Sequence, residues 1–395
     1  MKLRKEFLIA AALWASCMAA WGGFMIHVSG IFPTAIATTA LSAFGVGGLF
    51  GPLVVRFCGG KRSSGVVGLF GALGLLGAYG SAANDSALPL YASLAVVGAS
   101  IMTSISLVNA RIVKICRAGE TSVAYGLGAI CWAGWQAASP ITPACFLVAS
   151  APAFVLAALG FVCAAPTESD ASTAQNPEIA PATSGVFNVR DFAIFVAAVF
   201  AMNVLNTNYF FSVFAPFVKE NLTVAPNLIG AAHQISEFVT VILLGALLAK
   251  RPEWTRRAFI IGGFLTAGRY ALDKIAGENG DWILALISSC GHGASFSMLT
   301  SLCVTLAAAS LLKGANAATT ARCMSIVAFA AMALPAVVAP QVTRAILEAT
   351  DGWNEFWLAS AAALAVLSVC AMFVLPRFET QTQTQAQDGA TDSAA

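Results

Sequence analysis

Residues 227–273 read NLIGAAHQISEFVTVILLGALLAKRPEWTRRAFIIGGFLTAGRYALD, and this stretch decides how the rest of the chain is interpreted. It contains two apolar runs, 227–248 and 257–273, joined by a turn rich in Lys and Arg. A helical run of about 20 apolar residues crosses the roughly 30 Å of hydrocarbon in a bilayer. The stretch therefore predicts two neighbouring transmembrane helices that are connected at a membrane surface.

Two ionisable side chains interrupt these apolar runs. At a helical rise of 1.5 Å per residue, Glu237 lies about 15 Å from one face of the membrane and Arg269 about 8 Å from the same face. An ion left without a partner in hydrocarbon costs several kcal/mol, so intramembrane ions usually pair or face water. Arg269 has two possible partners, Glu237 across the helix hairpin and Asp273 one helical turn later, and both pairings remain open from the sequence.

The composition of the whole chain is that of an integral membrane protein. Of its 395 residues, 58% are hydrophobic and only 10% are charged. A soluble protein of this length could not cover its surface with so few polar groups. We therefore expect the lipid bilayer as the surroundings, no nucleic-acid partner and a monomer.

Apolar runs recur along the chain and predict twelve transmembrane helices, at residues 7–28, 35–56, 64–83, 87–110, 121–139, 142–164, 189–212, 227–248, 257–274, 282–308, 321–345 and 353–375. Residues 166–187, rich in Ala, Thr, Ser and Pro, predict a cytoplasmic linker because they cannot bury an apolar face. The linker separates an N-terminal half, residues 1–165, from a C-terminal half, residues 188–378. A low-complexity tail, residues 379–395, is expected to be disordered. The predicted fold is thus all-α, with two six-helix repeats.

The basic residues segregate to one side of this twelve-helix topology. Of the 21 Lys and Arg residues, only Lys219, Lys274, Arg344 and Arg269 fall elsewhere. Because positive charge accumulates in cytoplasmic loops, both termini are expected in the cytoplasm. We expect the location to be the bacterial cytoplasmic (inner) membrane.

Short motifs resemble those of a known transporter superfamily. Gly51-Pro52-Leu53-Val54-Val55-Arg56 is similar to the G-x-L-x-D-R loop motif of the major facilitator superfamily, although Val55 takes the acidic position. A related segment, Gly245-Ala246-Leu247-Leu248-Ala249-Lys250, occurs in the second half. An internal repeat around a central linker is the layout of that superfamily, in which two halves rock around a site at mid-membrane.

The second half is more specific. Gln234-Ile235-Ser236-Glu237, Gly268-Arg269-Tyr270 and Gly291-His292-Gly293-Ala294-Ser295-Phe296-Ser297 follow in the order of Q-x-S-E, L-R-[YF] and H/Y-G-x-x-F-D in the nucleoside:proton symporter family, which this chain resembles. In the first half, residues 21–24 and 106–109 match that family more loosely. The resemblance implies a symporter that carries out nucleoside transport without a cofactor.

The chain departs from the motifs of that family at several positions, of which Gly268, at the helix-nine leucine, is the milder change. The R-x-W-G-T-x-G-[WF] motif in helix five has Tyr125 and Ala129 in place of its arginine and threonine. The helix-ten aspartate falls on Ser297. The departures leave the transporter class as the expectation and the solute open.

The candidate site residues are the polar groups at mid-depth in the predicted helices. Glu237 and His292 are the expected proton-coupling residues, with a structural ion pair as the alternative for Glu237. The expected substrate-binding residues are Asn203, Asn206, Asn208, Trp132, Gln234, Glu237, Arg269 and Ser297. Asparagine is a poor helix former, so the three asparagines are expected to face a polar cavity, or else to bond neighbouring helices. Arg269 is a structural clamp or a solute contact, and Trp132 is a stacking surface or plain core.

The sequence thus predicts a secondary active transporter that moves a small polar solute, nucleoside or sugar-like, by alternating access and coupled to a proton. The alternative is a non-transporting sensor or scaffold of the same fold. No Walker A loop, H-E-x-x-H or G-x-S-x-G motif is present, so we expect neither an enzyme nor a bound cofactor or metal.

Overall fold

The computed structural model describes residues 4–51, 53–54, 63–116, 118–163, 187–208, 214–224, 226–313, 315–350, 352–376 and 378, and all regular structure in these ranges is helical. The main helices are α1 (Lys5–Gly22), α2 (Met25–Ile31), α3 (Thr34–Leu49), α5 (Ser63–Ala83), α6 (Ala87–Ile115), α7 (Ala118–Ala138), α8 (Ala144–Val162), α10 (Val189–Asn208), α11 (Phe214–Asn221), α12 (Pro226–Lys250), α13 (Thr255–Asn279), α14 (Trp282–Leu299), α15 (Leu302–Leu311), α16 (Ala317–Ala328), α17 (Leu334–Ala349) and α18 (Trp353–Val374). The predicted linker (residue 187 aside), tail and Val55–Arg56 motif lie outside the described residues.

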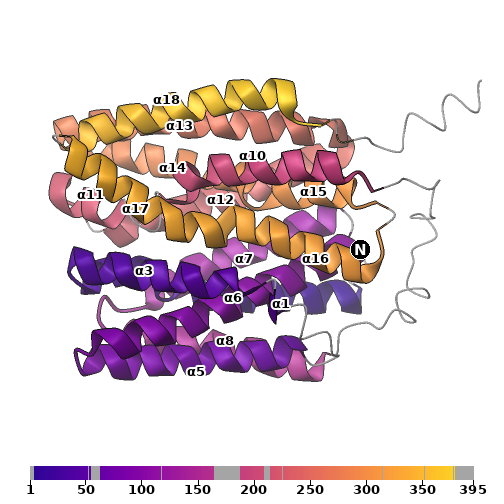
Figure 1. Ribbon diagram of the computed structural model, residues 1–395, viewed down its shortest axis with the longest axis horizontal. Coiled ribbons are helices and arrows are strands. Elements are labelled where there is room, and N and C mark those ends of the chain that lie inside the picture. Colours follow the sequence, from indigo (N-terminus) through magenta and orange to yellow (C-terminus); the bar gives the residue numbers. More distant parts are fainter. Residues whose placement is uncertain are drawn as a thin grey trace, which may run out of the picture.

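The helices form two bundles that lie side by side (Figure 1). One bundle contains α1 to α8 and the other α10 to α18. Three pairs of helices make the most extensive contacts between the bundles, α7 with α12, α3 with α17, and α6 with α16. Leaving the eight-residue α11 aside and counting α1 with α2, α14 with α15, and α16 with α17 as single rods, the described chain makes twelve rods. This confirms the predicted all-α fold.

Among the described residues, nine helical segments are long and apolar enough to cross a membrane, and Ala35–Leu49 is a shorter apolar helix. The two remaining rods, α7 and α13, are long enough but more polar. Polar residues inside a membrane helix mark function or helix packing rather than lipid contact. We therefore expect α7 and α13 to contain residues with a role in function or in helix packing.

The bundle is closed at both of its ends. We call one end the basic end, because Arg4, Lys114, Lys250 and Arg256 lie at helix termini there. At the basic end, α6 packs on α16 and α7 contacts α15. At the far end, α2 contacts α11. These contacts hold the two bundles together at both ends.

Two local breaks shape the helices of these bundles. A side chain at Gly22 would meet the Trp132 ring at 2.7 Å, so the glycine allows α1 to approach α7 closely where α1 gives way to α2. Residues Phe329–Ala333 form a turn of π-helix between α16 and α17. Pro335 has no N–H for the carbonyl one turn earlier, and wider turns of this kind relieve such a mismatch.

Candidate functional site

A small cavity of about 10 Å³, room for about one water molecule, lies between the two bundles. Its lining residues come from both halves of the chain and are Trp14, Met18, Trp21, Tyr125, Ala129, Trp132, Gln234, Glu237, Phe296, Ser301 and Met332. Three predicted substrate-binding residues, Trp132, Gln234 and Glu237, are therefore together at one cavity. Tyr125 and Ala129, where the resemblance to the symporter motif breaks down, also line it.

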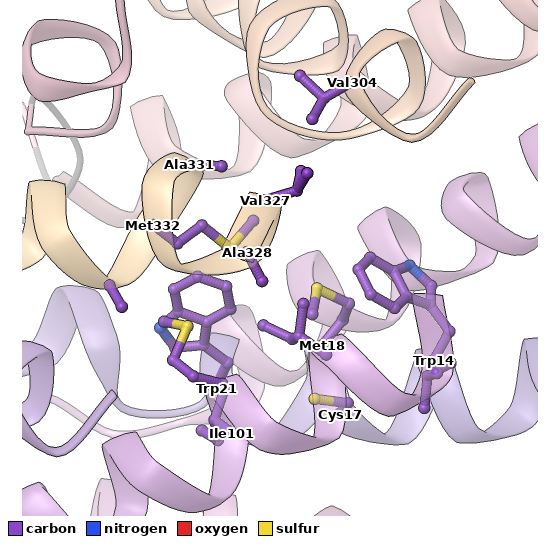
Figure 2. Packing of buried hydrophobic residues seen from close by; sticks show 14 of the residues in the cluster. Trp14, Cys17, Met18, Trp21, Ile101, Val304, Val327, Ala328, Ala331 and Met332 are labelled. Carbon is purple, nitrogen blue, oxygen red and sulfur yellow. The ribbon is translucent and has the colours of Figure 1, made fainter. Parts of the chain in front are cut away.

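Helix α1 supplies a wall of the cavity that the motif comparison did not identify. Figure 2 shows Trp14, Met18 and Trp21 on α1 facing Ala328 and Met332 of the opposite half. The spacing of four and then three residues places all three α1 side chains on one face of the helix. That spacing, with two tryptophans in it, is the sequence signal that could have identified them.

Glu237 is the only carboxylate on the cavity wall among the described residues, and it is 7% exposed. The Ser301 hydroxyl donates to its Oε1 at 3.5 Å, and Nε2 of His233 lies 3.9 Å from its Oε2. Within the described part of the chain, no Lys or Arg nitrogen lies within 4.0 Å of this carboxylate. A buried carboxylate in such surroundings needs a proton or another cation to offset the loss of water.

Two histidines continue from Glu237 into the C-terminal bundle. Nδ1 of His233 lies 2.8 Å from Nδ1 of His292, and the two rings are 4.5 Å apart. Nε2 of His292 lies 2.9 Å from the backbone carbonyl oxygen of Asn206. The result is a polar chain that runs from Asn206 on α10 through His292 on α14 to His233 and Glu237 on α12.

The backbone carbonyl of Asn206 determines which nitrogen of each histidine carries a hydrogen. A carbonyl oxygen only accepts, so Nε2 of His292 carries a hydrogen. In neutral His292, Nδ1 is then an acceptor, and Nδ1 of His233 must donate to it. Neutral His233 consequently presents a bare Nε2 to Glu237. A hydrogen bond between Glu237 and His233 therefore requires one added proton, held on the carboxyl group or on the imidazole.

Gly293 allows α12 and α14 to approach closely enough for the contact between His233 and His292. A side chain there would overlap the backbone oxygen of His233 and lie 2.8 Å from the backbone nitrogen of Glu237. Ser297, one turn along, donates to the Glu237 carbonyl at 3.3 Å and to that of Gly293 at 3.1 Å. Ser297 thus bonds the two helices together and is absent from the cavity wall.

Replacing Gly293 with Ala should therefore separate α12 from α14. We expect the free energy of unfolding of the purified protein to fall by about 1–3 kcal/mol, the usual cost of overpacking. Gly291→Ala on the same helix is the matched control, because the nearest atom to a side chain there lies 3.7 Å away. Unfolding midpoints of the two variants in one detergent provide the measurement. Equal midpoints would mean that the helices do not pack as closely as described.

Asn203 lies at a break in the rod made by α14 and α15. The helix is interrupted at Thr300 and Ser301, which frees backbone groups in a place without water. The Asn203 amide donates to the Leu299 carbonyl at 2.7 Å, and Thr300 donates to its Oδ1. Backbone groups without a helical partner must form hydrogen bonds inside a membrane protein. Here the Asn203 side chain on α10 bonds the free carbonyl of Leu299.

Asn206 bonds neighbouring helices in the same way. Its amide donates to Thr300 at 3.2 Å, and its Oδ1 accepts from Ser295 on α14 and Thr266 on α13, each at 3.2 Å. Both asparagines are fully buried and absent from the cavity wall, so the geometry matches the interhelical alternative rather than a solute contact. The Asn208 side chain lies outside the described residues.

Arg269 pairs with Asp273 on its own helix, at 3.2 Å, and the two side chains are 1% and 0% exposed. Its guanidinium also lies 4.2 Å from the centre of the Tyr270 ring. Asp273, which the sequence places near the end of a predicted membrane span, lies six residues before the end of α13 at Asn279. Arg269 is not on the cavity wall.

Tyr125 joins the two bundles beside the cavity. Its hydroxyl donates to Oδ1 of Asn109 on α6 at 2.8 Å and also contacts the hydroxyl of Thr305 on α15. The position that holds arginine in the related symporter motif therefore carries a neutral group here, and that group bonds to both halves. The cavity accordingly gains no positive charge from this position.

The arrangement of the two bundles is similar to that of solved major facilitator superfamily transporters. The sequence itself matches no family model, nor any curated protein. The nucleoside transporter NupG is similar with a TM-score of 0.62 and 15% identity, over 93% of this chain and 98% of its own. The proton:xylose symporter XylE, solved with 6-bromo-6-deoxy-D-glucose, is similar with a TM-score of 0.67 and 14% identity, over 97% of each chain. The human organic anion transporter MFSD10 has a TM-score of 0.68 at 13% identity, over 95% of this chain and 100% of its own. Identities this low establish the shared fold alone.

Proposed function

We propose that this protein is a proton-coupled secondary transporter of a small organic solute, with the solute bound in the cavity between the bundles. The observation that carries the proposal is Glu237, a buried carboxylate on the cavity wall that contacts His233 and Ser301. A purely structural carboxylate would be expected to pair with a buried arginine, as Asp273 does. The fold supports the transporter class, since the related structures include proton symporters.

The mechanism follows from the order of protons in the polar chain. In the state that the structure describes, one added proton is held on the Glu237 carboxyl group or on His233, whose Nε2 lies 3.9 Å from Oε2 of Glu237. His292 and the Asn206 carbonyl fix the orientation of the His233 ring. When the bundles separate at one end, water reaches the carboxylate and the proton can leave. Rocking to the other side restores the closed contact and the need for a proton. Glu237 is thus the carrier, and His292 positions its partner.

Transport by purified protein in proteoliposomes is the direct test. A thermal-shift screen of nucleosides, sugars, aromatic acids and amines would first identify a binding solute. We expect uptake of that solute to follow an imposed pH gradient and to stop when an uncoupler is added. Tight binding in detergent without any flux in proteoliposomes would instead favour the sensor or scaffold alternative.

The proposed location is the bacterial cytoplasmic membrane, with the basic end in the cytoplasm. On a background without the ten native cysteines, a single cysteine at Gly280 or in the linker, residues 166–187, reports the orientation. A membrane-impermeant thiol reagent should label Gly280→Cys in intact cells and should reach the linker only after lysis. Labelling of the linker in intact cells would show that the linker lies outside the cell and would contradict the proposed topology.

A further inference from the structure

The cavity wall consists mainly of aromatic rings. Trp14 lies against Tyr125 with ring centres 4.6 Å apart, and Trp21 lies against Trp132 at 4.8 Å, in both cases tilted by more than 50°. Phe296 adds a fifth ring to the lining. Rings arranged in this way present their electron-rich faces in several directions. Such faces attract cations, ammonium groups in particular.

The charged groups around the cavity have one sign. Glu237 on α12 faces it, and among the described lining residues there is no lysine or arginine. The titratable groups next to Glu237 are His233 on its own helix and Tyr125 on α7, with His292 on α14 behind His233. Helix α13 contributes Arg269, whose charge is paired with Asp273. An anion in this cavity would face Glu237 without compensation.

Two buried polar atoms on the wall lack a hydrogen-bond partner in the described structure. They are Oε1 of Gln234 and Nε1 of Trp14, in side chains that are 2% and 3% exposed. A buried polar group left in this condition is costly, so it indicates a binding partner. The unpaired acceptor at Gln234 lies one helical turn from Glu237, and an N–H group could donate to both.

We propose that the transported solute is an organic ammonium ion with an apolar or aromatic body, an inference that rests on the proposed function and specifies its substrate class. The cavity of this state has room for about one water molecule, so the solute enters as the bundles move apart. The ammonium group then donates to Glu237 and to Oε1 of Gln234, and the rings of Trp14, Trp21 and Trp132 contact the rest. One bound monocation replaces the one proton held on Glu237 or His233, so the charge of the site does not change. Because cation and proton exclude each other at one carboxylate, the coupling is an exchange of one for the other.

A matched pair of probes tests this assignment on the full-length protein in detergent. Phenethylammonium and 2-phenylethanol have almost the same shape and differ in charge, and uridine represents the nucleosides. Quenching of tryptophan fluorescence measures binding, and a pH indicator in weak buffer measures proton release. We expect phenethylammonium to bind at least about tenfold more tightly than the alcohol, with release of about one proton per cation bound.

Variants separate the role of charge from that of folding. Glu237→Gln should remove the preference for the cation and the proton release, and Trp14→Phe, which keeps a ring, should keep the preference. Glu348→Gln is the matched control, because that carboxylate is exposed and pairs with Arg344 at the surface. A Glu237→Gln protein that unfolds at the same temperature as the wild type excludes a folding defect.

The outcomes distinguish failure of this inference from failure of the proposed function. Equal or tighter binding of the alcohol or of uridine, or an unchanged preference in Glu237→Gln, would overturn the assignment of an ammonium ion. Uptake of uridine that depends on a proton gradient and on Glu237 would do so as well, while leaving the proposed function in place. Cation binding with proton release but without flux in proteoliposomes would support the assigned site and contradict transport.

Discussion

The Glu237→Gln variant is expected to lose proton-driven accumulation of solute completely while it continues to exchange solute across the membrane. Glutamine resembles the protonated carboxyl group in shape and stays neutral at every pH, so no proton can be taken up or released at this position. The carbonyl of the amide still accepts from an N–H group, and exchange should therefore persist at raised solute concentration. Accumulation and counterflow in the same proteoliposomes provide the two readouts.

Glu237→Ala should behave worse than Glu237→Gln, since it also removes the oxygen to which the Ser301 hydroxyl donates. Glu348→Gln should accumulate solute as the wild type does. If Glu237→Gln accumulates solute against its gradient with an unchanged dependence on pH, Glu237 is a structural group. In that case His292 becomes the next group to test.

The Asp273→Asn variant is expected to show the largest loss of stability. The substitution leaves the Arg269 guanidinium buried without its carboxylate, in a pair whose side chains are almost fully excluded from solvent. Breaking a buried ion pair by removing one partner costs about 3–5 kcal/mol. Yield in membranes and the midpoint of thermal unfolding should both fall.

Removing both charges distinguishes an ion pair from other roles of these residues. Arg269→Met combined with Asp273→Leu should recover much of the stability, because no uncompensated charge remains. Asp273→Asn protein with wild-type stability would contradict the assignment of a clamp. If Asp273→Asn protein were stable but did not bind solute, the alternative that Arg269 contacts the solute would be favoured.

The helices and the cavity carboxylate could be predicted from the sequence because they depend on local patterns. Apolar runs are long enough to cross a bilayer, and a carboxylate within such a run is costly, so Glu237 stands out without a structure. Gln234, one helical turn before Glu237, and Trp132, in the segment that matches the helix-five motif, were also expected at the site, and both line the cavity. These features can be predicted from the order of residues along the chain and from the free-energy cost of burying a charge.

Contacts between helices could not be predicted in this way. The pairing of His233 with His292 depends on the close approach of α12 and α14 at Gly293, and no spacing within either helix indicates it. The interruption at Thr300 lies inside an apolar run, so the need for Asn203 to satisfy the freed carbonyl was invisible. The sequence therefore left open whether Asn203 and Asn206 face a cavity or bond neighbouring helices, and in the structure they bond neighbouring helices.

Movement of protons driven by solute tests the role of Glu237 most directly. Proteoliposomes with a trapped pH dye and no pH gradient are given a solute gradient, and the internal pH is followed for wild type, Glu237→Gln and Glu348→Gln. We predict a pH change for wild type and Glu348→Gln that an uncoupler abolishes, and none for Glu237→Gln. Solute flux without any pH change in wild type, or an undiminished pH change in Glu237→Gln, would contradict proton coupling through this carboxylate.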